Sequence, residues 1–144
     1  NRNMIFMARK TLLKIPGMKV ALNSIDAVLV DTSGIAETKK SIEDAVSKLK
    51  NGRDIIVFPE GTRTKTGNLG NFKKGMFQMA INSGTSIIPV GVIGSRKVWR
   101  RNNYQFRPGI IKVKSGDPIN PADFKDIDAL ILHTKNEILR LHEA

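Results

Sequence analysis

Apolar and polar residues follow one another along this chain in a pattern that predicts helices packed on a parallel sheet. Between 37 and 50 the apolar residues recur at helical spacing, and Asn51-Gly52 provides a stop signal. Three short apolar runs are typical of buried strands, at 5–7, 27–30 and 54–58. Because strands alternate with helical segments, we expect an α/β fold with a mostly parallel central sheet flanked by helices.

The remaining elements have shorter or less regular patterns. Pro89 interrupts one apolar run, which favours a bulge or an edge position there. The last helical segment carries both histidines of the chain, His133 and His142, and we interpret them as surface residues. In all, we expect short helices at 10–14 and 18–22, a helix at 75–83, strands at 86–93 and 110–114, and a final helix within 121–143.

A polar sequence, Phe58-Pro59-Glu60-Gly61-Thr62-Arg63, begins at the end of the third predicted strand. Proline has no N–H to donate to a sheet, and a glycine permits a turn that a Cβ would obstruct. A carboxylate, a hydroxyl and an arginine are then presented at the end of a rigid element, where the guanidinium is able to bind an anion through two contacts. The next residues, 64–71, form a polar loop long enough to move as a flap.

Three further polar residues are candidates for the same site. Lys73 and Lys74 precede the helix predicted at 75–83, where exposed amides and positive side chains together bind anions. The alternative is that both are ordinary surface lysines. Asp31 ends the strand at 27–30, and in a parallel sheet it would face the same crevice as Glu60. Its alternative is a turn former or helix cap.

The composition limits the possible classes of protein. With 144 residues, 40% of them apolar, the chain has material for one core, and we expect a single domain over residues 1–144. Cysteine is absent, which excludes a disulfide framework, a thiolate metal site and a cysteine nucleophile. No apolar run reaches the roughly eighteen residues of a membrane span. No metal-ligand cluster is visible in the sequence.

The net charge of +11 comes from one part of the chain. Residues 61–116 carry no Asp or Glu, and their basic residues are Arg63, Lys65, Lys73, Lys74, Arg96, Lys97, Arg100, Arg101, Arg107, Lys112 and Lys114. We call them the basic block. It is either a solvated surface or a binding surface for a polyanion, such as acidic lipid headgroups, an acyl carrier protein, the phosphates of coenzyme A or nucleic acid. Scattered aromatics and the absence of a recognition-helix pattern argue against nucleic acid.

Trp99 is the only tryptophan and lies within the basic block. A tryptophan beside Lys and Arg is typical of a membrane-interface anchor, because the ring lies at headgroup depth while the charges bind acidic lipid. A tryptophan packed within a loop would have the same sequence. The anchor is the interpretation that we favour.

Four blocks of sequence, taken in order along the chain, resemble one family. They are Ala8 to Gly17, Ala27 to Asp31, Phe58 to Arg63 with the following Lys73-Lys74-Gly75, and Ile87-Ile88-Pro89-Val90. Together they resemble the glycerolipid acyltransferases, especially the 1-acyl-sn-glycerol-3-phosphate acyltransferases. The resemblance implies a glycerol-3-phosphate acyltransferase-like fold and the transfer of a fatty acyl group to lysophosphatidic acid in phospholipid biosynthesis. It implies acyl-CoA or acyl carrier protein as co-substrate, no cofactor, and association with the cytoplasmic face of a membrane.

The resemblance also implies roles for individual residues. Arg63, with Lys73 or Lys74, would hold the phosphate of the lysophospholipid acceptor. Glu60 and Gly61 would shape the loop and contact the glycerol, and Thr62 completes the set of substrate-binding residues.

The chain departs from the family pattern at two points. The family's catalytic His-x4-Asp motif is not in the 144 residues, since Ile138 stands five positions after His133. We therefore expect this chain alone to be inactive, and because it begins with Asn1, we expect a domain truncated at its N-terminus. Thr32 stands where the family has an arginine after Asp31, which bears on phosphate affinity and acceptor choice. The alternative function is a non-catalytic lipid- or acyl-carrier-protein-binding domain.

Overall fold

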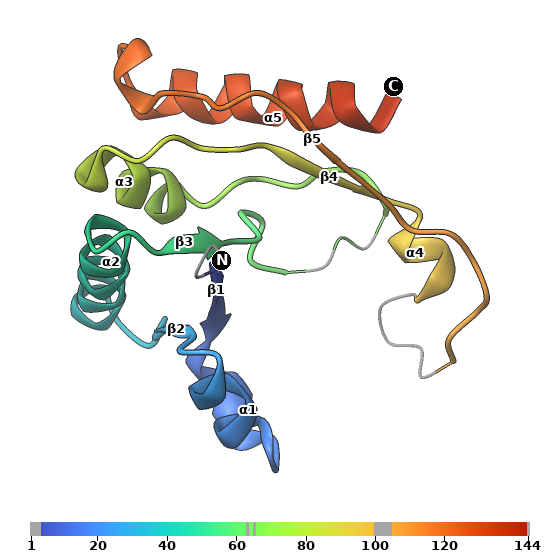
Figure 1. The fold of residues 1–144 in the computed structure, drawn as a ribbon, viewed down its shortest axis with the longest axis horizontal. Coiled ribbons are helices and arrows are strands. Elements are labelled where there is room, and N and C mark those ends of the chain that lie inside the picture. Colours follow the sequence, from blue (N-terminus) through green and yellow to red (C-terminus); the bar gives the residue numbers. More distant parts are fainter. Residues whose placement is uncertain (1–3, 63, 65, 100–104, 144) are drawn as a thin grey trace. The chain divides into compact units, whose positions relative to one another are not determined.

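The chain folds into two units, each with its own hydrophobic core. Figure 1 traces the helices and strands of both units. The computed structural model describes residues 4–62, 64, 66–99 and 105–143. The first unit comprises Asn1–Phe58 and Gln78–Ser83, and the second comprises Pro59–Phe77 and Gly84–Ala144. The single domain predicted over residues 1–144 stays a prediction. None of the helices in the described part of the chain combines the length and the apolar run needed to span a bilayer.

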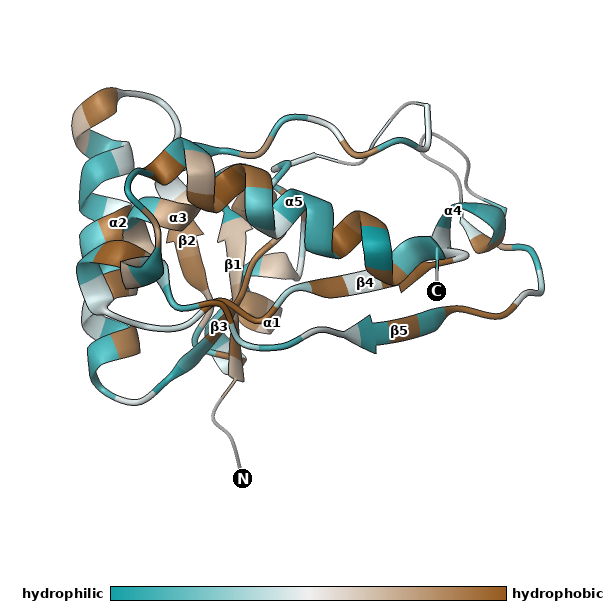
Figure 2. Ribbon diagram, turned by 90° about the horizontal axis from the view of Figure 1, so that it is seen from above, coloured by the Kyte–Doolittle hydropathy of each residue, from teal (hydrophilic) through white to brown (hydrophobic). Residues whose placement is uncertain are grey.

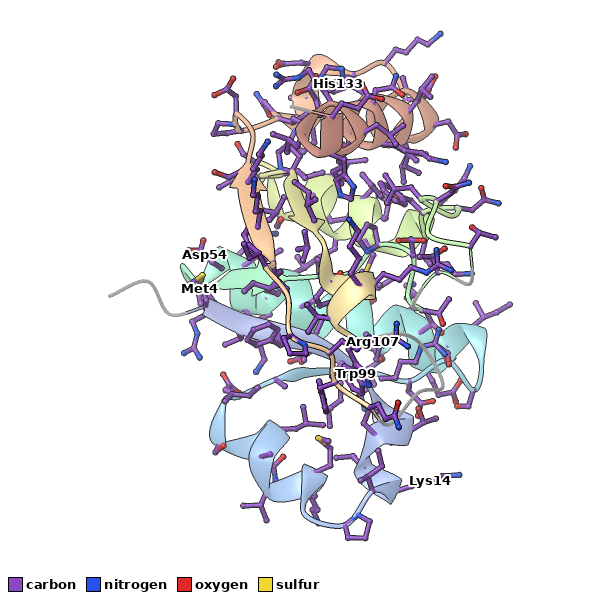
Figure 3. All side chains as sticks on the ribbon, turned by 90° about the vertical axis from the view of Figure 1, so that its right-hand side faces the viewer. Met4, Lys14, Asp54, Trp99, Arg107 and His133 are labelled. Carbon is purple, nitrogen blue, oxygen red and sulfur yellow. The ribbon has the colours of Figure 1, made fainter. Side chains whose placement is uncertain are left out.

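A three-stranded parallel sheet organises the first unit. Strand β1 (Met4–Arg9) lies between β2 (Val28–Val30) and β3 (Asp54–Ile56). The first half of β1 pairs with β3, beginning with Met4 beside Asp54 (Figure 3), and its second half pairs with β2. The α/β class and the parallel sheet predicted from the sequence are confirmed.

Helix α2 (Ile35–Lys50) packs its apolar face on this sheet. Its fully buried Ala45 meets Ile5 of β1 and Val28 of β2 in the core of the first unit. Apolar and polar residues alternate along the ribbon of α2 in Figure 2, as the helical spacing in the sequence predicts. The helix ends at the predicted place, where Gly52 adopts a φ of 77°.

Short elements join the strands of the first unit close to the predicted positions. The 3-10 helix η1 (Lys10–Lys14) and helix α1 (Met18–Ser24) connect β1 to β2. The strand predicted at 54–58 is shorter than expected, since β3 pairs with β1 only over Asp54–Ile56. Hydrogen-bond pairing, and not the end of the apolar run, therefore sets the end of β3 at Ile56.

An antiparallel pair of strands organises the second unit. Strand β4 (Val90–Ile93) pairs with β5 (Lys112–Ser115), and an isolated bridge between Ile87 and Ile119 continues the pairing on the other side of Pro89. The proline interrupts the ladder because it has no N–H. The interrupted strand predicted at 86–93 is confirmed.

Helix α5 (Ile127–Glu143) lies close against β4. A Cβ on Gly91 would lie 3.1 Å from Cβ of Leu141, so glycine at this position permits the close approach. The core beneath α5 consists of Phe72, Phe77, Ile119, Leu130 and Ile138. The remaining elements are α3 (Lys74–Ser83), α4 (Ser95–Val98) and the 3-10 helix η2 (Pro121–Asp123).

Leu130 provides a test of the core of the second unit, because it is completely buried. Leu130→Ala should lower the free energy of unfolding by about 2 to 5 kcal/mol, through lost transfer energy and the cavity left behind. Urea titration followed by circular dichroism measures this loss. The matched control is Leu132→Ala on the same helix, where the side chain is 60% exposed and the change should stay within about 0.5 kcal/mol. Equal losses for the two variants would contradict this assignment of the core.

Candidate functional site

The segment of residues 59–73, which we call the 59–73 loop, is closed at its base by two hydrogen bonds. The Lys73 amide donates to the carbonyl oxygen of Pro59 over 2.8 Å, and the Gly70 amide donates to Oε2 of Glu60 over 2.7 Å. A Cβ on Gly70 would lie 2.9 Å from that oxygen, so the backbone approaches the carboxylate closely. The Glu60 carboxylate is thus bound to the backbone of its own loop.

Two apolar side chains anchor the same loop in the core of the second unit. Phe72 is buried and stacks on Phe77, with ring centroids 6.1 Å apart, and the half-buried Leu69 packs against this cluster. Gly61 adopts a φ of 65°, in the left-handed region that favours glycine. The sequence predicts a polar flap at 64–71, and the structure adds an apolar anchor within it.

A third contact holds the far side of the loop. Nη1 of Arg96, on α4, donates a hydrogen bond to the carbonyl oxygen of Thr66. Arg96 also lines a hollow of about 430 Å³ together with Gly67, Gly94 and Lys97. Sequence reasoning placed Arg96 only within the basic block, because nothing in the sequence relates it to Thr66.

The predicted phosphate-binding residues differ in their contacts with carboxylates. Lys73 and Lys74 are both exposed, and Lys74 is the first residue of α3, one position earlier than predicted. Nζ of Lys74 lies 2.7 Å from Oδ1 of Asp128, whereas within the described part of the chain no carboxylate forms a salt bridge with Lys73. Thr62 is exposed in the loop. Arg63 lies outside the described residues.

Asp31 follows β2 in the first unit. Its carboxylate accepts hydrogen bonds from Nζ of Lys10 at 2.8 Å, and from Oγ and the amide of Ser33 at 2.6 and 3.0 Å. The Lys10 ammonium, and then the two Ser33 donors, hold the pKa of Asp31 well below its usual range. Asp31 is therefore a turn former, the alternative left open by the sequence. Its position beside Glu60, which belongs to the second unit, stays a prediction, and Thr32 is exposed.

The two histidines are exposed on α5, as predicted. The ring of His133 packs against Phe124, with centroids 5.1 Å apart. Among the residues that the structure describes, no group of three or more His, Cys, Asp or Glu side chains is arranged to hold a metal ion.

Trp99 follows α4 and is 44% exposed. Its ring is tilted against Phe106, itself 69% exposed, with centroids 4.9 Å apart. The backbone is joined next to this pair, where the amide of Arg107 donates to the carbonyl oxygen of Val98, and Figure 3 shows Arg107 beside Trp99. Arg100 and Arg101 of the basic block lie outside the described residues. The tryptophan thus packs within a loop and still presents part of its ring to the surface.

Comparison with known proteins identifies relatives of this chain. The sequence model of the family described as Acyltransferase matches residues 1–93. A 1-acyl-sn-glycerol-3-phosphate acyltransferase of Cocos nucifera is 37% identical over 98 residues, which are 67% of this chain and 32% of that protein. One of Borreliella burgdorferi is 33% identical over 98 residues, or 68% of this chain and 39% of that protein. The chain therefore spans about a third to two fifths of the length of these relatives.

The fold is also found in a solved structure. The crystal structure of the 1-acyl-sn-glycerophosphate acyltransferase of Thermotoga maritima aligns with a TM-score of 0.82 and 29% sequence identity. The alignment covers 96% of this chain and 55% of that one. The glycerol-3-phosphate acyltransferase-like fold expected from the sequence is confirmed.

The contact between Lys10 and Asp31 predicts a shift in titration. Because the pKa of Asp31 is depressed below its ordinary value of 3.8, its carboxylate stabilises the fold above that pH, and the contribution is lost as the pH falls towards the folded-state pKa. In Lys10→Met the pKa of Asp31 should rise, only partly because Ser33 still donates. Carboxyl-carbon NMR measures both values. Lys14→Met is the control, since Lys14 lies on the same 3-10 helix and is exposed (Figure 3). An unchanged Asp31 titration in Lys10→Met would refute the contact.

Proposed function

Because this chain belongs to the Acyltransferase family, we propose that its protein transfers a fatty acyl group from acyl-CoA or an acyl carrier protein to lysophosphatidic acid. The observation that carries this proposal is the closed 59–73 loop, which contains Pro59 to Arg63 of the family sequence and ends at the exposed Lys73. The relatives are named for acylating a 1-acylglycerol phosphate, and a loop with basic side chains suits a phosphate-bearing acceptor.

The chemistry of the proposed reaction is a simple acyl exchange. The acceptor hydroxyl oxygen attacks the thioester carbonyl carbon, a C–O bond forms, the C–S bond breaks, and the thiol leaves with the proton that the hydroxyl gave up. A general base is needed to remove that proton, and the 144 residues contain no His-x4-Asp motif to supply it. We therefore assign to this chain the binding of the acceptor and not the proton transfer.

Within the loop we propose a separate role for each residue. Arg63 and Lys73 bind the acceptor phosphate, and Glu60 keeps the loop closed through the Gly70 amide. Gly61 and Thr62, which lie between Glu60 and Arg63 in the chain, contact the glycerol. Lys73 is preferred to Lys74 because the Lys74 ammonium already faces Asp128.

A second function is favoured by one observation. The chain keeps the acceptor loop of the family, yet its two histidines lie exposed on α5, and Ile138 stands five positions after His133. A non-catalytic domain that binds a lysophospholipid or an acyl carrier protein would have the same features. The assay below separates the two functions.

We further propose that the second unit rests on an acidic membrane surface at its cytoplasmic face. Trp99 and Phe106 form an exposed aromatic pair, and Lys97 and Arg107 of the basic block lie near them in the chain. Exposed aromatic rings prefer the headgroup region, and each nearby cation adds attraction to acidic lipid.

An acyltransferase assay tests the proposed function. The protein encoded by the complete gene should acylate lysophosphatidic acid with acyl-CoA or acyl carrier protein as donor, and the 144-residue chain alone should show no transfer above the enzyme-free control. In the active protein, Arg63→Ala should raise the acceptor KM about tenfold or more, since a charged hydrogen bond contributes about 1.5 to 3 kcal/mol. Lys73→Ala should raise it further than Lys74→Ala does.

Three results of this assay would count against the proposal. Binding of lysophosphatidic acid without turnover by the complete protein would favour the non-catalytic domain. An unchanged acceptor KM in Arg63→Ala would remove the phosphate role of that residue. Transfer by the 144-residue chain would show that its base lies elsewhere among these residues.

The membrane surface is tested by sedimentation with liposomes of acidic lipid. Trp99→Ala should reduce the bound fraction, because the ring no longer enters the headgroup region. Val20→Ala is the control, since Val20 is 74% exposed in the first unit and lies outside the basic block. If Trp99→Ala sediments like the unmodified chain, the anchor is excluded. Neutral liposomes should bind both variants less, because the basic block gains nothing from them.

A further inference from the structure

One contact in the second unit that the proposed function does not use joins the basic block to the candidate loop. Nη1 of Arg96 donates to the carbonyl oxygen of Thr66, thirty residues earlier in the chain. Arg96 lies beyond residues 1–93, the part of the chain that the family model matches. Thr66 is three residues after Arg63. The family model therefore does not include Arg96, although it includes the loop that carries Pro59 to Arg63.

Arg96 lies on a short helix that backbone hydrogen bonds hold in place. Helix α4 follows β4 directly, and β4 is paired along its whole length with β5. The turn between β4 and α4 is made by Gly94, with a φ of 87°, and the Trp99 amide closes α4 by donating to the carbonyl oxygen of Ser95 over 2.8 Å. The guanidinium is thus presented from a hydrogen-bonded element and not from a second loop.

The loop is shaped to receive this guanidinium. Gly67 adopts a φ of 105°, and a Cβ at that position would lie 2.5 Å from Nη1 of Arg96. The Gly67 amide donates to Oγ1 of Thr64 over 3.1 Å, and the Asn68 amide donates to Oγ1 of Thr66 over 3.3 Å. These bonds join the loop to itself on either side of the Thr66 carbonyl, and Arg96 donates to that carbonyl. The absence of a side chain at Gly67 leaves the space that the contact needs.

We propose that Arg96 is a positioning residue for the acceptor. By holding the Thr66 carbonyl, it fixes the far side of the 59–73 loop, whose base is already held by Glu60 and Lys73. A loop that is already ordered loses no further conformational freedom when the acceptor binds, so the affinity for the acceptor rises without a new contact to it. This inference rests on the proposed function.

Four variants separate a positioning contact from a general effect of charge. Arg96→Gln removes the guanidinium, and Arg96→Lys keeps the charge but loses the planar fork that reaches the carbonyl. Lys97→Gln removes the neighbouring charge of the same hollow and leaves the Thr66 contact in place. Gly67→Ala places a Cβ where the guanidinium lies. Circular dichroism of each variant shows whether the fold is retained.

Two measurements on the protein encoded by the complete gene test the proposal. In hydrogen exchange, the amides of residues 64–70 should exchange faster in Arg96→Gln, Arg96→Lys and Gly67→Ala than in Lys97→Gln. In the acylation assay, Arg96→Gln and Arg96→Lys should raise the KM for lysophosphatidic acid about threefold to tenfold, as expected for one partly exposed charged hydrogen bond. Their kcat should change much less, because Arg96 is not assigned to the reacting atoms.

The following results would overturn the proposal or show that another effect explains the data. A wild-type KM in Arg96→Lys would show that charge alone matters, and equal effects of Lys97→Gln and Arg96→Gln would show the same. Unchanged exchange of residues 64–70 in Arg96→Gln would show that the contact does not restrain the loop. If the wild-type protein transfers no acyl group, the proposed function fails, while hydrogen exchange still decides whether Arg96 holds the loop.

Discussion

The hydrogen bond from the Lys73 amide to the Pro59 carbonyl is the constraint on which the candidate site depends. It joins the two ends of a fifteen-residue segment, so every residue between them belongs to a closed loop. Closing a loop of this length costs conformational entropy, and burial of Phe72, next to Lys73 in the chain, offsets part of that cost. The loop is thus held by the core of the second unit as well as by its polar contacts.

A helix or strand could be predicted from the sequence where its apolar pattern depends on that element alone. Helix α2 has a regular apolar face and a glycine at its end, and its bounds lie within two residues of the prediction. The end of β3 could not be predicted, because Val57 and Phe58 continue the apolar run although the pairing with β1 ends at Ile56. Phe58 is 65% exposed, so an apolar residue here does not mark a buried strand.

The candidate site could be located from the sequence, but its contacts could not. Pro59 to Arg63 are contiguous, so they fall in one loop whatever the fold. The partners of the candidate residues are distant in sequence: Thr66 of the loop meets Arg96, and Lys74 of α3 meets Asp128, fifty-four residues away. No spacing rule relates such positions, since each depends on how β4, α4 and α5 pack. Gly67 is evident in the sequence, but only the structure shows that its missing side chain leaves room for the Arg96 guanidinium.

The electrostatics of the loop follow from these contacts more than from the net charge of +11. Glu60 is three residues before Arg63, and a free carboxylate there would repel an acceptor phosphate. Its Oε2 instead accepts the Gly70 amide, so part of its charge is directed into the backbone of the loop. Asp128 acts in the opposite sense, because it lies against Lys74 and offsets that cation. Of the two adjacent lysines, Lys73 therefore contributes the larger share of positive potential at the base of the loop. Distant members of the basic block matter less here, since salt screens exposed charges beyond about 8 to 10 Å.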